Sequence, residues 1–240
     1  MRLSQVSGSV GMSTLYLNQA TRDARKSSQR LASGKKLTTD LVGDLGRLNT
    51  MKGHRNTIKV ELDNLHSAND YANVKDGALS QIIELAQQIS EDYASGKTST
   101  DAGIAQKTAD LLDIISSTQF NGQDVFSTSG VAIGNITISS EIRTLTADDN
   151  FKDVDTTKAS LEKILKEAAQ TGAIVNGIDA RIGVNTTMQQ NLDEAISRIE
   201  EVDITEETLK YNEHLMRQQL AASMITRQQE NQMSLINLLV

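Results

Sequence analysis

An apolar residue recurs at alternating steps of three and four positions through the first thirty residues of the chain. Only Ser13 and Ser27 interrupt this stripe, which consists of Leu3, Val6, Val10, Leu17, Ala20, Ala24 and Leu31. The spacing is the heptad of a coiled-coil helix. It predicts a helix over residues 3–32 that packs lengthwise on a partner and ends before Gly34.

The far end of the chain carries a second apolar pattern with looser helical spacing. Its members continue almost to the terminus: Leu209, Leu215, Met216, Leu220, Met224, Leu235 and Leu238. Chain ends are usually frayed and polar, so apolar ends need a partner, either each other or a neighbouring subunit. We expect the first and last helices to pair.

The composition suits long, thin packing seams better than one thick core. The 240 residues include no Pro and no Trp, and aromatic residues make up 3%. Leu, Ile, Val and Ala therefore supply the apolar contacts, and no proline interrupts a long helix. The absence of cysteine excludes disulfides, thiol catalysis and thiolate metal sites. A net charge of -7 without a Lys/Arg cluster argues against nucleic acid as a partner.

Neither membrane insertion nor a signal peptide is expected. The longest uninterrupted apolar stretches are only a few residues, too short to cross a bilayer. Residues 1–5 (MRLSQ) lead into the polar-studded heptad and not into the apolar centre of a signal peptide. If the protein leaves the cell, we expect it to use another route.

The pattern changes several times between the two ends. An irregular connector containing glycines is expected over residues 34–56, and the strongest helical pattern of the chain follows over residues 57–93. Alternating apolar residues around Gly134-Asn135 predict a small β-hairpin. Further helices are expected over residues 102–116, over 157–171, from about 171 to 199, and from 204 onward.

These elements predict a mainly α fold, a long coiled-coil-like helical bundle with paired N- and C-terminal helices and a small β-hairpin region. We expect two domains. Residues 1–43 and 203–240 would form a discontinuous terminal coiled-coil core domain. Residues 44–202 would form a helical-bundle shell domain with a small β element at about 125–145.

The sequence offers little for catalysis. His54, His66 and His214 are isolated, and none lies in an HExxH motif or beside a nucleophile. The carboxylates within residues 84–92 and 200–207 have helical spacing without histidine partners, which is typical of a solvated face. We predict no catalytic residues, no metal site and no cofactor.

Five segments resemble bacterial flagellins, and they occur in the family's order. Near the start, residues 28–37 (SQRLASGKKL) resemble SLQRLSSGxRIN, residues 76–80 (DGALS) resemble EGALS, and residues 118–122 match TQFNG. Near the end, residues 197–203 (SRIEEVD) resemble SRIEDADYA, and residues 231–239 (NQMSLINLL) resemble NQVPQNVLSLL.

The resemblance covers about residues 1–126 and 170–240. The unmatched middle corresponds to the part that varies among flagellins, and here it is short, so large outer domains should be absent.

The resemblance implies a structural subunit, not an enzyme, that self-polymerises into the extracellular flagellar filament used for motility. It implies unfolded export through the flagellar type III system, with an export chaperone and the filament cap and junction proteins as partners. It also implies that the terminal helices form the core of the homopolymer. The self-assembly core residues expected are Leu3, Val6, Val10, Leu17, Ala20, Ala24, Leu31, Leu209, Leu215, Met216, Leu220, Met224, Leu235 and Leu238.

One segment departs from the family pattern. Flagellins that an innate immune receptor recognises carry LQRxRELxVQ, where this chain has AQQISEDYAS at residues 86–95. Gln88, which follows Gln87, and Ser90 replace the two arginines, and Asp92 replaces a leucine. These changes remove the charged and apolar anchors of such an interface, so we expect weak recognition or none.

Two other readings are kept. The hook-filament junction protein of the same superfamily also begins in a way similar to residues 1–4 (MRLS), although the TQFNG and SRIEE segments favour flagellin. A coiled-coil binding module that does not polymerise would have folded, protease-resistant ends as a monomer. An inserted peptidase is disfavoured because the middle segment is short and holds no HExxH.

Overall fold

The chain is mainly helical, as predicted, and its contacts divide it into two compact units. A computed structural model describes the backbone of residues 2–237 and the side chains of residues 11–234. Unit 1 contains the residues up to Gly53 and those from Leu192 onward, and unit 2 contains residues 54–191. The boundary falls within two long helices, α2 (Leu45–Ala94) and α5 (Val154–Glu200).

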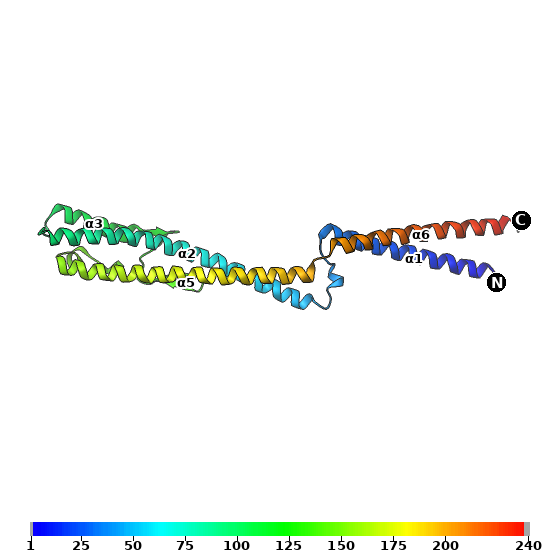
Figure 1. Cartoon of the computed structure of the whole chain (residues 1–240), viewed down its shortest axis with the longest axis horizontal. Coiled ribbons are helices and arrows are strands. Elements are labelled where there is room, and N and C mark those ends of the chain that lie inside the picture. Colours follow the sequence, from blue (N-terminus) through cyan, green and yellow to red (C-terminus); the bar gives the residue numbers. More distant parts are fainter. Residues whose placement is uncertain (1, 238–240) are drawn as a thin grey trace. The chain divides into compact units, whose positions relative to one another are not determined.

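Unit 1 is built on a pair of antiparallel helices, α1 (Arg2–Ser33) and α6 (Ile204–Asn237), which lie side by side (Figure 1). A short 3-10 helix, η1 (Thr38–Asp40), follows α1. A small apolar cluster of Leu41, Leu48 and Ile196 joins the beginning of α2 to the end of α5. Unit 1 therefore contains more residues than the terminal domain expected from the sequence, because the beginning of α2 and the end of α5 pack with it.

Two of the predicted helix boundaries are wrong. The long helix begins at Leu45 and not near residue 57, because Leu45 and Met51 pack against the cluster around Leu48. This packing outweighs the low helix propensity of Gly46 and Gly53. The predicted break near residue 171 does not exist either, since α5 continues through buried Thr171 to Glu200.

Unit 2 packs α2 and α5 with α3 (Ala102–Ser117) and an irregular segment that we call the insert, residues 118–153. Asp101 caps α3 by accepting a hydrogen bond from the Gly103 amide. Most of the buried apolar side chains of α2 contribute to one core cluster together with α3 and the insert. Its fully buried members are Tyr71, Ala72, Leu79, Ile82, Ala86, Ile89, Leu111, Val125, Phe126 and Ile164.

The insert contains two small antiparallel hairpins. Strands β3 (Val131–Ile133) and β4 (Ile136–Ile138) form the hairpin that the sequence predicted, with Val131 opposite Ile138. Strands β1 (Gln119–Phe120) and β2 (Gln123–Asp124) form a second hairpin that was not predicted. The turn of this second hairpin uses Asn121 and Gly122, both at positive φ, as a two-residue hairpin turn requires. The insert ends with η2 (Ile142–Thr144) and α4 (Ala147–Asn150).

Polar side chains of α2 hold the insert by its main-chain carbonyls. The Tyr71 hydroxyl donates to the Val125 carbonyl at 2.7 Å, and the Tyr93 hydroxyl donates to the Phe151 carbonyl at 2.6 Å. Burial raises the pKa of Tyr71 to about 12, so this phenol stays protonated and remains a donor at neutral pH. Between them, the Lys75 ammonium donates to the Ser139 carbonyl at 2.7 Å.

Lys75 also forms a buried ion pair with Glu167 of α5. The Nζ and Oε1 atoms lie 2.8 Å apart, and the two side chains are 2% and 5% exposed. The other carboxylate oxygen of Glu167 accepts the amides of Glu141 and Ile142 at 3.0 and 3.1 Å. This ion pair therefore joins α2, α5 and the insert at one point.

Gly130 should be intolerant of a side chain. Its φ is +76°, and a Cβ atom there would lie 2.9 Å from Cγ2 of Thr137. We expect Gly130→Ala to destabilise unit 2 by about 1–2 kcal/mol in chemical denaturation, because both left-handed strain and the contact oppose it. Gly77→Ala, on an open stretch of α2, should instead stabilise by about 0.5–1 kcal/mol. Equal effects of the two changes would contradict this account.

Candidate interaction surface of the terminal helices

The contact between α1 and α6 is lined by small and polar side chains. We call it the inner seam. On α1 its buried members are Ser13, Ala20, Ala24 and Ser27. On α6 the buried and half-buried positions recur at alternating steps of four and three: Glu207, Tyr211, His214, Gln218, Ala221, Ile225, Gln228 and Gln232. Over the residues whose side chains the structure describes, the inner seam has the heptad geometry but few large apolar side chains, so this part buries little apolar area.

Large apolar side chains of α6 lie outside the inner seam. We call them the α6 apolar surface: Leu209, Met216, Leu220, Met224 and Met233. Leu209 and Met216 are 66% and 63% exposed. Each of these two residues stands midway between two consecutive seam positions, which places it on the side of α6 that faces away from α1.

α1 has an equivalent surface of its own, formed by Met12, Leu15 and Tyr16 and called here the α1 apolar surface. Leu15 is 66% exposed and lies between the seam positions 13 and 17, so it faces away from α6. Leu15 on α1 and Leu209 and Met216 on α6 therefore lie on opposite outer sides of the helix pair. Soluble monomers rarely expose such patches, which usually mark contacts with other molecules.

A groove of about 380 Å³ runs along one flank of the inner seam and connects the two helices. Tyr16 and Ala20 line it from α1, and Leu220 and Met224 line it from α6. Asp23 and Arg217 are the charged residues of its lining. The groove is open and apolar enough to receive side chains of another helix.

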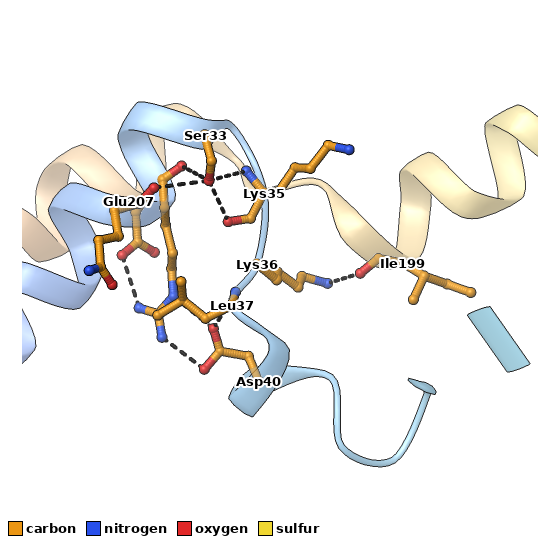
Figure 2. A network of polar contacts seen from close by, with 9 residues as sticks. Ser33, Lys35, Lys36, Leu37, Asp40, Ile199 and Glu207 are labelled. Carbon is orange, nitrogen blue, oxygen red and sulfur yellow. Dashed lines mark hydrogen bonds and ion pairs between the residues drawn. The ribbon is translucent and has the colours of Figure 1, made fainter. Parts of the chain in front are cut away.

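A network of hydrogen bonds, which we call the junction clasp, joins residues 30–40 to residues 199–207 (Figure 2). The chain turns after α1 at Gly34, whose φ is +67°. The Lys36 amide then donates to the Glu200 carbonyl at 2.7 Å, and the Val202 amide donates to the Gly34 carbonyl at 3.1 Å. The Lys36 ammonium adds a bond to the Ile199 carbonyl at 3.0 Å.

Arg30 is the charged centre of the junction clasp. Its guanidinium contacts both carboxylate oxygens of Asp40, at 2.8 and 2.9 Å, and donates to Glu207 at 3.1 Å. Glu200 is held by Lys35 at 3.3 Å and by Lys52 at 3.0 Å. Charge-assisted bonds of this kind fix geometry, so the clasp sets where α6 begins relative to α1.

The three carboxyl groups of the clasp have lowered pKa values. The hydrogen bond from Arg30 holds the pKa of Asp40 below its ordinary 3.8, and the bond from Lys52 holds the pKa of Glu200 below 4.5. Burial raises the pKa of Glu207, but the nearby Ser27 hydroxyl and the hydrogen bond and charge of Arg30 lower it by more, so the net shift is downward.

Among the described residues, no group of three or more His, Cys, Asp or Glu side chains could hold a metal ion. The same part of the chain contains no helix that is long and apolar enough to cross a membrane.

Residues 154–239, which contain α5 and α6, match the family model of the bacterial flagellin C-terminal helical region. This part of the chain is similar to the bacterial flagellins. Flagellins are structural proteins of the flagellar filament, and the mainly helical fold agrees with this similarity. No curated protein shows a significant match to the chain.

The flagellin-type core residues predicted from the sequence fall into three groups. Leu17, Ala20, Ala24 and Leu31 lie at the inner seam, and Leu215 is half-buried beside it. Leu209 and Met216 face away from α1, whereas Leu220 and Met224 lie at the flank of the seam and line the groove that α1 also lines. The side chains of Leu3, Val6, Val10 and Leu235, and the whole of Leu238, lie outside the described residues.

The seam positions of α6 were missed because they are polar. A search for apolar spacing passes over Tyr211, His214, Gln218 and Gln228. The signal that could have revealed them is the unbroken four-three spacing of medium-sized side chains from Glu207 to Gln232, irrespective of polarity.

In the segment that resembles the flagellin receptor site, the charge of Asp92 is paired with lysines of the same chain. Gln87 is exposed, and Gln88 is half-buried and lies 3.4 Å from the Glu84 carboxylate. Asp92 pairs with Lys107 and Lys97, each at 2.7 Å, and these hydrogen bonds hold its pKa below the ordinary value. Weak receptor recognition stays a prediction.

The junction clasp should weaken in acid. Because the folded pKa values of Asp40, Glu200 and Glu207 lie below their unfolded values, their stabilisation is present above about pH 4.5 and is lost as the pH falls through the lowered values. Hydrogen exchange at the Lys36 and Val202 amides, compared with α3 amides at each pH, measures this. We expect protection at neutral pH and its progressive loss as the pH falls below the ordinary pKa values of 3.8 and 4.5.

The Asp40→Asn variant is the control for this titration. It should lose part of the Lys36 and Val202 protection already at neutral pH and show a smaller further loss in acid. Protection at these amides that does not change between pH 7 and pH 3, while the protein remains folded, would contradict the proposed role of the carboxylates.

Proposed function

We propose that this chain is the self-polymerising subunit of a flagellar filament, and that unit 1 forms contacts between neighbouring copies. The observation that carries the proposal is the placement of large apolar side chains on the outside of the α1–α6 pair. Leu209, Leu15 and Met216 are each more than 60% exposed in the single chain. Covering them in an assembly supplies the apolar burial that the polar inner seam lacks.

The arrangement of the two apolar surfaces supports an open polymer. Leu15 of α1 and Leu209 and Met216 of α6 face away from the partner helix and so lie on opposite sides of the pair, and a two-fold dimer through either side leaves the other uncovered. Head-to-tail contacts between unlike surfaces cover both, and they generate a filament when the rotation does not close. This matches the filament role of the family.

Export in an unfolded state through the flagellar type III system, and motility as the purpose of the filament, are the finer parts of the proposal. The chain has no cysteine, so no disulfide hinders unfolding. The polar inner seam favours a terminal helix pair that is marginal before assembly and stable after it. An export chaperone would have the α6 apolar surface to cover, and the cap and junction proteins would contact unit 1 of terminal subunits.

Electron microscopy of the purified full chain after seeded or salt-induced polymerisation tests the proposal. The control is a variant that lacks residues 1–32 and therefore lacks most of α1. We expect filaments from the full chain and none from the variant. Full-length protein that stays monomeric but binds the ends of preformed filaments would replace the proposal with the junction-protein function. Monomers that bind no filament ends would contradict both.

A further inference from the structure

Methionine is the only source of oxidisable sulfur in this chain, and four of its seven methionines are exposed on the terminal helices α1 and α6. The 240 residues contain seven Met and no Cys. Met216, Met224 and Met233 belong to the α6 apolar surface, at 63%, 49% and 70% exposure, and Met12 of the α1 apolar surface is 60% exposed. We refer to these four as the unit 1 methionines.

We propose that the unit 1 methionines form an oxidant-sensitive modification site, at which peroxide converts thioethers to sulfoxides and thereby prevents a subunit from entering the polymer. The inference rests on the proposed function, since it concerns the surfaces that neighbouring copies would cover. Exposure decides which sulfurs react, and these four side chains are open to solvent in the single chain.

The reaction needs only a peroxide. The thioether sulfur attacks one oxygen of hydrogen peroxide, the O–O bond breaks, and a sulfur–oxygen bond forms. Sulfur is oxidised by two electrons and peroxide is reduced to water, with no net uptake or release of protons. No second thiol takes part, which suits a chain without cysteine.

A sulfoxide changes the α6 apolar surface at the positions that matter most for burial. Met224 lines the groove between α1 and α6, together with Leu220 and Tyr16. Met216 lies on the outward side of α6. The S=O group is a strong hydrogen-bond acceptor, and burying it against apolar side chains without a donor is unfavourable.

The same geometry implies a difference between free and assembled subunits. Before assembly the four thioethers are exposed, and after assembly a neighbouring copy covers them and excludes the oxidant. Oxidation therefore acts on newly available subunits and spares the finished polymer. Sulfoxides are chemically reversible, but two enzymes are needed because the oxidation creates two epimers.

Met188 provides an internal control. It lies on α5 in unit 2, belongs to neither the α1 nor the α6 apolar surface, and is 50% exposed. It should therefore oxidise at a similar rate in the free subunit. Its sulfoxide should have little effect on polymerisation, because it adds no polar group to the terminal helices.

Partial oxidation followed by sedimentation tests the inference on the full chain. Monomer is treated with limiting hydrogen peroxide, quenched, polymerised and sedimented, and each methionine sulfoxide is quantified by peptide mass spectrometry in pellet and supernatant. We expect sulfoxides at Met216 and Met224 to be depleted at least about fivefold in the pellet, with Met12 and Met233 also depleted. The Met188 sulfoxide should be distributed equally.

The outcomes separate the inference from the proposed function. If untreated protein forms no pellet, the proposed function fails. If untreated protein polymerises but unit 1 sulfoxides are distributed as evenly as that of Met188, the inference fails alone. Depletion of every sulfoxide, Met188 included, also overturns it.

A variant adds an independent check. Leu replaces Met with similar volume and good helix propensity but cannot form a sulfoxide. Full peroxide treatment should raise the critical concentration of wild type and Met188→Leu at least about tenfold. It should leave that of the Met12→Leu/Met216→Leu/Met224→Leu/Met233→Leu variant unchanged, and equal inhibition of this variant would refute the inference.

Discussion

Replacing Lys75 with Met is expected to destabilise unit 2 by about 3–5 kcal/mol, the usual cost of breaking a buried ion pair on one side. The change removes the ammonium but leaves Glu167 charged, 5% exposed and without its cation. It also removes the donor to the Ser139 carbonyl. Urea denaturation followed by circular dichroism measures the loss.

The second partner provides the discriminating variant. Lys75→Met combined with Glu167→Leu should recover much of the loss, because a buried pair replaced by apolar groups of similar size is often nearly neutral. Recovery should be incomplete, because Glu167 also accepts the amides of Glu141 and Ile142. Lys210→Met is the matched control, since its partner Glu206 is 64% exposed and such pairs contribute about 0–1 kcal/mol. A similar loss in the control and in Lys75→Met would contradict the assigned role of burial.

The second large effect is expected on assembly and not on folding. Met216→Lys with Leu220→Lys places two charges on the α6 apolar surface, where the wild-type side chains are 63% and 58% exposed. Losing the burial of two such side chains removes about 3–6 kcal/mol from association, which raises the critical concentration at least about a hundredfold. Thermal unfolding of the monomer should barely change, because neither side chain is buried in the single chain.

The control for this pair adds the same charge at polar positions of α6. Gln219→Lys with Gln229→Lys changes two exposed side chains without removing apolar surface. Sedimentation of polymer at increasing protein concentration compares the variants. If both double variants raise the critical concentration equally, net charge and not the α6 apolar surface controls assembly.

The sequence predicted those parts of the fold that depend on local spacing. The heptad of α1 gave its helix nearly to the residue, and the alternation around Gly134 gave the hairpin β3–β4. The start of α2 was misplaced because a glycine-rich stretch has low helix propensity on its own and becomes helical through packing with Ile196, far away in sequence. Local patterns do not contain such contacts.

For the apolar surfaces of the terminal helices, local spacing likewise left the contact partner undetermined. Apolar spacing identified Leu209, Met216 and Leu220 as residues in need of a partner, but it could not say which partner. The structure shows that α1 is not that partner for Leu209 and Met216, since His214, Gln218 and Ala221 occupy the inner seam. The ion pair between Lys75 and Glu167 was not predicted, because its partners come from separate helices that are far apart in the sequence.

The way α2 holds the insert bears on how such a protein can change over generations. Tyr71, Lys75 and Tyr93 bind carbonyl oxygens, a group that every residue carries whatever its side chain. The attachment points thus place no demand on residue identity at exposed positions such as Thr128 and Thr137. The exposed side chains of the insert can therefore be substituted, which changes the surface that the protein presents, while the helices that hold the insert stay the same.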